Sequence, residues 1–337
     1  MIKTIKKIKK NKKPKKNKEN NSPNMPFKKI SNSLFLLLPF LFLFLLTLFS
    51  PPPFSYWTWY SPSSSSASIP PSLLKYQFPP EPETSSVLPP LVSPDTLSFL
   101  VLDPSTNSIL LGKNIHRRLY PASTTKIVTA ATALNLYSLG ETITSTQSWD
   151  EGKVLGIEPN QSFTTASLVQ AMLVYSANDA ALLLAAHHPQ GPAVFVSQMN
   201  KLARYYSLND SHFVNVNGLH AGNHFSSAYD LAQFARLSLR SPVIRASISQ
   251  STVSIEDLAH QPYELENTNE LLEVLPEVKG VKTGWTPEAG ECFVGLLDLN
   301  GHELITVVLG SKDRFSDTKE LIAWAKKAIS WQTYTPY

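Results

Sequence analysis

The stretch Pro121-Ala122-Ser123-Thr124-Thr125-Lys126, followed by the apolar run 127–131, decides how the rest of the sequence is interpreted. If its first two residues lead into a helix, Ser123 lies in the first turn and Lys126 lies on the same helix face. The free backbone N–H groups of a first turn can stabilise negative charge beside that hydroxyl and amine. A serine, an amine and free N–H donors are the parts of an acyl-transfer site. An ordinary helix start could carry the same residues, because Ser and Thr are favoured there.

Two further motifs stand downstream in the order that such a site requires. Ser176-Ala177-Asn178 lies between two predicted helices, and Lys282-Thr283-Gly284 ends a predicted strand. The set S-x-x-K, S-x-N and K-T-G occurs in penicillin-binding proteins and class A β-lactamases, which carry S-D-N where this chain has S-A-N. K-T-G at a given place arises by chance on the order of once in several thousand positions, so coincidence explains the ordered set poorly.

Beyond these motifs, the sequence resembles the low-molecular-mass penicillin-binding proteins, which are serine-type D-alanyl-D-alanine carboxypeptidases. The resemblance runs from about residue 96 to residue 331. It implies an α+β fold of the β-lactamase/transpeptidase type, in which helices flank an antiparallel sheet and form a helical subdomain. Many members also carry a C-terminal β-rich domain, which we do not expect here. The further segments that resemble the family are Tyr120 before the first motif, Asp179-Ala180, His212-Phe213-Val214-Asn215, Asn217-Gly218-Leu219, His224-Phe225-Ser226-Ser227-Ala228-Tyr229-Asp230, Asn267-Thr268-Asn269, Gly280-Val281, Trp285-Thr286, Ala289-Gly290 and Arg314.

The order of the predicted elements agrees with that fold. Strands are predicted for 96–103, 108–111, 278–283, 291–297 and 303–309, and the last pair turns at Asn300-Gly301. Helices are predicted from the Ser123 segment to near Gly140 and for 165–174, 179–186, 192–205, 226–239 and 316–331. We therefore expect an antiparallel sheet assembled from both ends of the body, with a helical insertion between them.

The chemistry of acyl transfer suggests a catalytic role for three side chains. Ser123 would attack the carbonyl between two terminal D-alanines and form an acyl-enzyme. Its hydroxyl needs a base, and Lys126 qualifies only when neutral; burial and the second cation Lys282 would both lower the pKa of Lys126. Ser176 can relay a proton toward the leaving amine. The path that carries each proton is left open.

Other residues of the motifs are expected to bind substrate. Asn178 can hold the peptide amide of the substrate. Lys282 and Thr283 offer a cation and a hydroxyl to the terminal carboxylate, which suits an exopeptidase. Gly284 lets the strand approach closely because it has no side chain.

The resemblance adds two positions to the site. The backbone N–H of Trp285 would join that of Ser123 in an oxyanion hole, and Arg314 would assist in binding the carboxylate. No cofactor and no metal are expected. A zinc site at His212, His220 and His224 is disfavoured because their spacing is loose and because two of them belong to segments that resemble the family and have a structural role there.

The only cysteine of the chain, Cys292, excludes an intrachain disulfide and a thiolate metal cluster. It stands in an apolar strand-like setting, which is typical of a buried and inert thiol. A catalytic cysteine is formally open but is disfavoured for this reason.

The N-terminal part differs in composition from the body. The first 30 residues contain 12 lysines and one acid, Glu19, which leaves 18 basic and 25 acidic residues elsewhere, so the body is acidic although the pI is about 8.9. This balance argues against a nucleic-acid-binding body. We expect a basic disordered cytoplasmic tail (1–32), a transmembrane anchor or signal segment (33–50), a Pro/Ser-rich linker (51–93) and the peptidase domain (94–333).

The apolar segment also predicts orientation. Lysines before it and a cluster of Tyr and Trp after it place the N-terminus inside and the body outside a bacterial cell membrane. A cleaved signal peptide is the alternative, although no small-residue cleavage site directly follows the apolar run. In both cases the body would be extracytoplasmic, where it meets peptidoglycan stem peptides and β-lactams.

Three other functions compete with the carboxypeptidase. A class A β-lactamase needs a Glu after S-x-N to activate the deacylating water, and no Glu occurs between Asn178 and Leu239. A D,D-endopeptidase would cut cross-linked peptides with the same residues. A non-catalytic β-lactam sensor would stall after acylation, but sensors usually carry a signalling domain. Release of D-alanine from a pentapeptide separates the carboxypeptidase from these alternatives.

Overall fold

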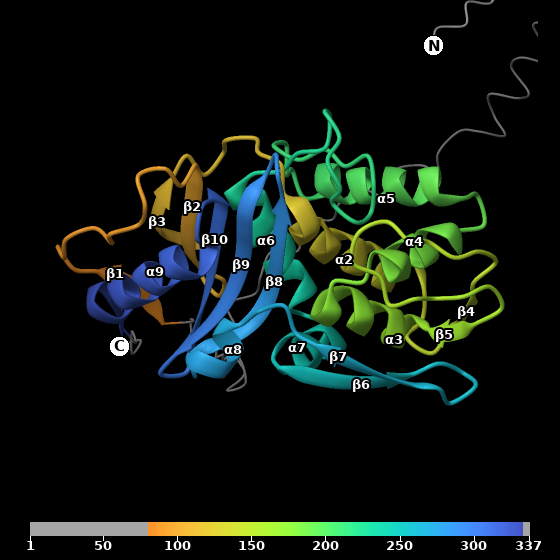
Figure 1. Cartoon of the computed structure of the whole chain (residues 1–337). Helices are drawn as coiled ribbons and strands as arrows, with labels where there is room; N and C mark the ends of the chain where they lie inside the picture. The colour runs from red at the N-terminus through yellow and green to blue at the C-terminus, as the bar shows by residue number, and fades with distance from the viewer. Residues whose placement is uncertain (1–79, 333–337) are drawn as a thin grey trace, which may run out of the picture. The chain divides into compact units, whose positions relative to one another are not determined.

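A computed structural model of the protein describes residues 80–332 (Figure 1), and a five-stranded antiparallel sheet lies at its centre. The strand order is β3-β2-β10-β9-β8, so strands from both ends of the described chain pair with one another. The α+β fold expected from the sequence is therefore confirmed. The strands are β2 (Ser98–Asp103), β3 (Ser108–Lys113), β8 (Val278–Thr286), β9 (Gly290–Leu299) and β10 (His302–Ser311).

The turn between β9 and β10 lies at Asn300-Gly301, as predicted. Both residues have positive φ, 58° and 86°, which is the conformation of a type I′ hairpin turn and the reason for the Asn-Gly preference there. Strand β9 is buried on both faces of the sheet, because Val294 and Phe293 belong to two separate apolar clusters. A strand covered on both faces carries a nearly continuous apolar sequence, as β9 does.

Helices cover both faces of the sheet (Figure 1). On one face lie α2 (Lys126–Leu136) and α6 (Ala228–Ser238), and on the other lie α9 (Arg314–Ala328) and the short α8 (Leu271–Val274). A helical block lies beside the sheet and consists of α3 (Thr165–Gln170), η2 (Ala171–Tyr175), α4 (Asn178–Ala186), α5 (Pro192–Tyr205) and α7 (Pro242–Ile248). Two small antiparallel pairs accompany it: β4 (Thr142–Thr144) with β5 (Ser162–Thr164), and β6 (Thr252–Glu256) with β7 (Pro262–Glu266).

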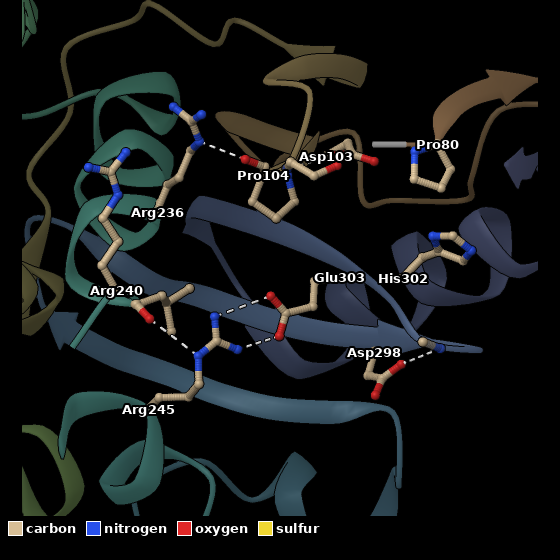
Figure 2. Close-up of a pocket in the computed structure, with 12 residues that line it drawn as sticks. Pro80, Asp103, Pro104, Arg236, Arg240, Arg245, Asp298, His302 and Glu303 are labelled. Atoms are coloured by element: carbon tan, nitrogen blue, oxygen red, sulfur yellow. Dashed lines mark hydrogen bonds and ion pairs between the residues drawn. The ribbon is translucent and has the colours of Figure 1, made fainter. Parts of the chain in front are cut away.

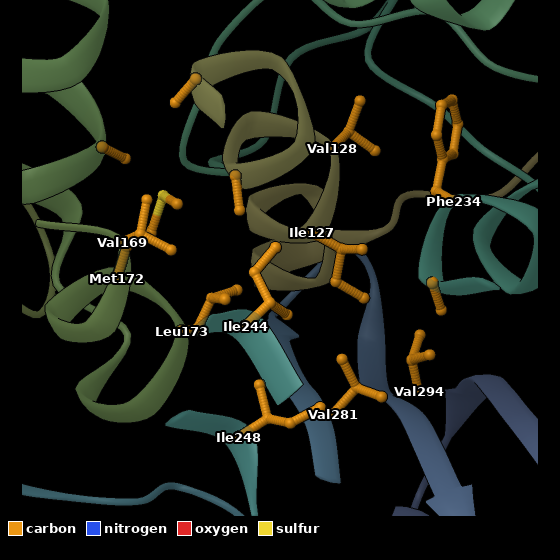
Figure 3. Packing of buried hydrophobic residues seen from close by; sticks show 14 of the residues in the cluster. Ile127, Val128, Val169, Met172, Leu173, Phe234, Ile244, Ile248, Val281 and Val294 are labelled. Carbon is orange, nitrogen blue, oxygen red and sulfur yellow. The ribbon is translucent and has the colours of Figure 1, made fainter. Parts of the chain in front are cut away.

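Helix α2 lies between the sheet and the helical block, as Figure 3 shows. Its residues Ile127 and Val128 are completely or almost completely buried, and they share one apolar cluster with Met172 of η2 and with Val281 and Val294 of the sheet. A helix that is apolar around its circumference is stable only when other elements enclose it. The Ser-x-x-Lys stretch leads into this helix and is thus fixed at the centre of the fold.

The structure corrects three details of the predicted elements. The first motif begins with a 3₁₀ turn, η1 (Ala122–Thr125), before α2 starts at Lys126. The helix predicted for 165–174 is split, since α3 continues as the π-helical segment η2. The last helix ends at Ala328 and not at residue 331, because Ile329–Gln332 form β11, which pairs with β1 (Glu81–Thr84).

Strand β1 lies within the range 51–93 that was assigned to a linker, so the end of that range pairs with the folded body. The basic tail (1–32), the apolar segment (33–50) and the linker up to residue 79 lie outside the described residues. Among residues 80–332, none of the helices combines the length and the apolar character needed to cross a bilayer.

We expect the buried carboxylate of Asp317 to be essential for docking α9 onto the start of the domain. It accepts hydrogen bonds from Ser93 N (3.0 Å), Ser311 Oγ (2.6 Å) and Thr96 Oγ1. Replacing Asp317 by Ala leaves these donors without an acceptor, so the free energy of unfolding should fall by about 3 kcal/mol. Urea denaturation measures this change. The control Lys319→Ala, on an exposed position of the same helix, should change stability by less than about 0.5 kcal/mol; equal losses in both variants would contradict the prediction.

Candidate active site

The hydroxyl of Ser123 and the amine of Lys126 meet where η1 passes into α2. Lys126 Nζ lies 2.9 Å from Ser123 Oγ, within hydrogen-bond distance. The turn is unusual because Ala122 has φ +48°, in the left-handed region that is rare for a residue with a Cβ. Gly218 packs on this turn so closely that a Cβ there would lie 1.8 Å from the Ala122 carbonyl oxygen. Because Gly218 has no side chain, its backbone packs directly on the Ala122 turn and holds the turn in place.

The Lys126 side chain is completely buried. Its Nζ donates to Asn178 Oδ1 at 2.6 Å and to the carbonyl oxygen of Asn217 at 3.0 Å, and it lies 3.5 Å from Ser176 Oγ. Burial lowers the pKa of Lys126 to about 7, although the Asp179 carboxylate acts in the opposite direction. A substantial fraction of this amine is therefore neutral at physiological pH, which is the form that can accept a proton.

The Ser-x-Asn motif follows η2 and opens α4. Ser176 ends η2 in the left-handed conformation (φ +70°), which turns its hydroxyl toward Lys126. Asn178 bridges two segments, because its Oδ1 accepts from Lys126 and its Nδ2 donates to the Glu151 carbonyl at 2.8 Å. The next residue, Asp179, is fully buried and accepts from the backbone N–H groups of 155–157 at 2.8–3.0 Å. Asn178 and Asp179 thus hold the loop 151–157 beside the site.

The third motif supplies a second buried amine. Lys282 Nζ, on β8, donates to the Thr283 carbonyl at 3.1 Å and to Thr268 Oγ1 at 3.3 Å. The pKa of Lys282 lies well below its ordinary value, chiefly through burial and then through the charges of Lys126, Lys153 and Arg314. The sequence predicted that burial and the charge of Lys282 would both lower the pKa of Lys126. Burial is the main cause for both amines, and the repulsion between them lowers the pKa of Lys282.

Strand β8 lies directly against η1 at Gly284. A Cβ at this position would lie 2.8 Å from the Ser123 backbone nitrogen and 3.0 Å from the Ala122 Cβ. Only glycine therefore permits this approach, which brings the strand edge beside the Ser123 hydroxyl. Arg314 Nη1, from α9, donates to the Gly284 carbonyl at 3.2 Å and lies 3.8 Å from a Glu291 carboxylate oxygen.

These groups line a cavity of about 420 Å³. The side chain of Trp285 stands at this cavity and is 60% exposed, while Lys282 lies buried next to it. Each site residue expected from the sequence is thus in the cavity wall or directly behind it. The lining residues are Ser123, Gly152, Lys153, Ser176, Asn178, Leu219, Thr268, Thr283, Gly284, Trp285, Thr286, Pro287 and Arg314.

Four groups of the site were not identified from the sequence. They are the Asn217 carbonyl, the Thr268 hydroxyl, the Asp179 carboxylate and the Lys153 amine. Asp179, Asn217 and Thr268 lie in segments that resemble the family, so their position in the sequence was available as a signal. The backbone carbonyl of Asn217 has no signature in side-chain chemistry, and Lys153 lies in a loop without a motif.

A larger cavity, of about 690 Å³, lies where α6 ends and β10 begins, and Figure 2 shows that several of its charged side chains bond to neighbours in the cavity wall. Arg245 pairs with Glu303, and Arg236 Nε donates to the Pro104 carbonyl at 2.6 Å. The amine of Lys126 and the hydroxyl of Ser123 do not line it. The smaller cavity is therefore the candidate active site.

Cys292 and the histidines lie outside this chemistry. Cys292 is completely buried, and burial raises its pKa to about 11, so its thiolate is scarce near neutral pH. His224 is buried and makes a 2.8 Å hydrogen bond with Thr125 Oγ1. Within residues 80–332, no group of three His, Cys, Asp or Glu side chains is arranged to hold a metal ion.

The fold and the lysine-paired serine define a penicillin-binding-protein-like peptidase domain, and solved structures share this fold. The Streptomyces K15 DD-transpeptidase has a TM-score of 0.66 at 24% identity, covering 71% of this chain and 98% of that one. A penicillin-binding protein homolog from Mycobacterium tuberculosis has a TM-score of 0.66 at 25% identity, covering 72% of this chain and 95% of that one.

Sequence comparison identifies the family. A family model described as D-alanyl-D-alanine carboxypeptidase matches residues 85–313, so the chain belongs to this family. The D-alanyl-D-alanine carboxypeptidase DacF of Bacillus subtilis is 30% identical over 242 residues, which are 68% of this chain and 61% of that protein. DacB2 of Mycobacterium tuberculosis is 30% identical over 216 residues, 63% of this chain and 74% of that protein. The match to DacF thus spans about three fifths of that relative's length.

Replacing Gly284 by Ala should force β8 and η1 apart. The added Cβ would meet backbone and Cβ atoms of η1 at 2.8–3.1 Å, and such overpacking costs about 1–3 kcal/mol of stability. Thermal unfolding measures the loss. The control Gly140→Ala, at a position where an added Cβ has no neighbour within 4 Å, should leave the midpoint nearly unchanged. A Gly284→Ala protein as stable as the control would show that the contact is not tight.

Proposed function

We propose that this protein is a serine D-alanyl-D-alanine carboxypeptidase, which removes the terminal D-alanine from peptidoglycan stem peptides through an acyl-enzyme on Ser123. The observation that carries this proposal is the completely buried Lys126 amine, 2.9 Å from Ser123 Oγ and with a pKa of about 7. A serine hydroxyl beside a base that is neutral near pH 7 is an activated nucleophile. Family membership supports the choice of substrate.

In the acylation step, neutral Lys126 would take the Ser123 proton as Oγ attacks the carbonyl carbon between the two D-alanines. The carbonyl oxygen becomes an oxyanion, which the backbone N–H groups of Ser123 and Trp285 would stabilise. Collapse of the intermediate breaks the C–N bond, and Ser176 would pass a proton to the leaving nitrogen. D-Alanine departs, the remaining peptide stays on Ser123 as an ester, and water hydrolyses this ester and restores the hydroxyl.

The residues of β8 and its surroundings would bind the substrate. Lys282, Thr283 and Arg314 would receive the terminal carboxylate, and Asn178 would hold the peptide amide. A carboxylate that enters the cavity favours the charged form of Lys282, because an opposite charge at short range raises the pKa of an amine. Burial makes this attraction stronger than it would be in water. The same arrangement explains why β-lactams, which carry a carboxylate, are expected as covalent inhibitors.

We further propose that the peptidase domain works outside the cytoplasm, at the bacterial cell wall. The apolar segment 33–50 would anchor it in the cell membrane with the N-terminus inside, and the linker would separate it from the bilayer. The lysines that precede this segment and the aromatic residues that follow it support this orientation.

Replacing Ser123 by Ala should abolish the activity, because no other nucleophile can form the ester. The wild-type protein should release one equivalent of D-alanine per pentapeptide with repeated turnover, and the rate should fall by about 10⁴-fold or more in the variant. A D-amino acid oxidase assay measures release. A fluorescent penicillin should label the wild type, and peptide mapping should place the label on Ser123.

The matched control is Ser251→Ala, an exposed serine outside the cavity, which should keep full activity. If the Ser123→Ala variant still trimmed pentapeptides, the mechanism would be wrong. If the wild type cut only cross-linked dimers and released no D-alanine, it would be an endopeptidase with the same nucleophile.

The pH dependence of acylation should follow the ionisation of Lys126. Only the neutral amine can act as the base, so the acylation rate constant should be low at pH 5, reach half its maximum near pH 7 and level off above pH 8. Stopped-flow acylation by a fluorescent penicillin measures this profile. Lys126→Arg should lose roughly a thousandfold in rate at every pH, since guanidinium stays charged. Lys201→Arg, at an exposed lysine of α5, is the control; a flat wild-type profile between pH 6 and 8 would exclude Lys126 as the base.

A further inference from the structure

Lys153 is a cation in the candidate active site that the proposed mechanism does not use. It stands on the loop 151–157 and lines the same cavity as Ser123, Ser176 and Asn178. The three motifs do not include it, and none of the ion pairs among residues 80–332 involves it. Its Nζ lies 3.8 Å from the centre of the Tyr175 ring, a cation–π distance that holds the amine beside η2.

The backbone on both sides of Lys153 is fixed by Asn178 of the second motif and by Asp179, which follows it. The Lys153 carbonyl accepts from Asn178 N at 2.7 Å, and the Glu151 carbonyl accepts from the Asn178 side chain. On the other side, the Asp179 carboxylate accepts from the N–H groups of Leu155 and Gly156. These hydrogen bonds fix the loop backbone at Lys153, so the lysine is held in a defined position relative to Asn178. A lysine on an ordinary surface loop has no such hydrogen bonds to a site.

The charges around Lys153 leave it available to a ligand. The pKa of Lys153 is lowered, chiefly by burial of its amine, and Glu266 acts in the opposite direction without forming an ion pair with it. The other cations of the site, Lys282 and Arg314, stand on β8 and α9. Lys153 stands on a loop of the helical block, so the cavity has cations on two of its walls.

We propose that Lys153 is a specificity-determining residue that binds a second anionic group of the substrate, a side-chain carboxylate on the acyl side of the scissile bond. This inference rests on the proposed function, in which Lys282, Thr283 and Arg314 receive the terminal carboxylate of the leaving D-alanine. Lys153 lies with Asn178, which would hold the peptide amide on the acyl side. The preferred peptide then has an acidic residue directly before its two D-alanines.

The test uses three synthetic peptides that all end in D-Ala-D-Ala and differ in the preceding residue, which carries a carboxylate, the corresponding amide or an amine. The wild type should show a kcat/KM about fivefold to tenfold higher for the carboxylate peptide than for the amide peptide. Lys153→Met should reduce kcat/KM for the carboxylate peptide to the level of the amide peptide and leave the latter within twofold. Lys153→Arg should retain the preference, and Lys153→Glu should shift it toward the amine peptide.

A second readout does not depend on peptide hydrolysis. Carbenicillin differs from benzylpenicillin by one carboxylate on the acyl side chain. The ratio of their acylation rates at Ser123 should fall about fivefold or more in Lys153→Met, and it should not change in Lys201→Met, an exposed lysine outside the cavity. If the wild type acylated but released no D-alanine, the proposed function would fail while this ratio still tested Lys153.

The outcome that overturns the inference is a loss in Lys153→Met that is the same for all three peptides and both penicillins. Such a uniform loss would assign Lys153 to loop structure or to the shared terminal carboxylate. An unchanged preference in Lys153→Met would also overturn it, since the cation would then contact no upstream anion.

Discussion

An ammonium group withdrawn from water loses hydration worth several kcal/mol, and the Lys126 side chain is completely buried. The surrounding structure offsets that loss in two ways. It supplies acceptors to the amine, namely Asn178 Oδ1, the Asn217 carbonyl and the Ser123 hydroxyl. It also lowers the pKa to about 7, so that the neutral form, which has a smaller desolvation penalty, is well populated. Both effects require that several distant segments stay in contact around one atom.

The tight contacts of the site follow from that requirement. Gly218 and Gly284 let two separate segments approach the backbone of η1 more closely than any other residue would allow. Asp179, which is fully buried, ties the loop 151–157 to the start of α4. Helix α2, which begins at Lys126, is enclosed by the residues of the larger apolar cluster. The reactive pair is therefore positioned by packing and backbone geometry, which cost no reorganisation when a substrate arrives.

The sequence predicted the parts of the site whose chemistry depends on side-chain type. Ser123, Lys126 and Lys282 belong to short motifs, and the sheet from both ends of the body follows from the pattern of apolar runs. The Asn217 carbonyl could not be predicted from side-chain type, because every residue has a carbonyl and only the tertiary fold places this one beside Lys126. Strand β1 could not be predicted for a related reason, since four residues in a Pro-rich segment become a strand only when β11 pairs with them.

The two buried amines are electrostatically coupled, and this coupling bears on how substrate recognition relates to reactivity. Without a ligand, a charge on Lys126 lowers the pKa of Lys282, so the two amines resist being charged at the same time. Under the proposed function, a substrate carboxylate would hold Lys282 in its charged form and would offset, at Lys126, the positive charge that Lys282 gains. The ion pair adds little net charge beside Lys126, so Lys282 can bind as a cation while Lys126 stays available as a base. Two buried lysines can in this way divide carboxylate binding and proton transfer between them, which a single lysine beside the serine could not do.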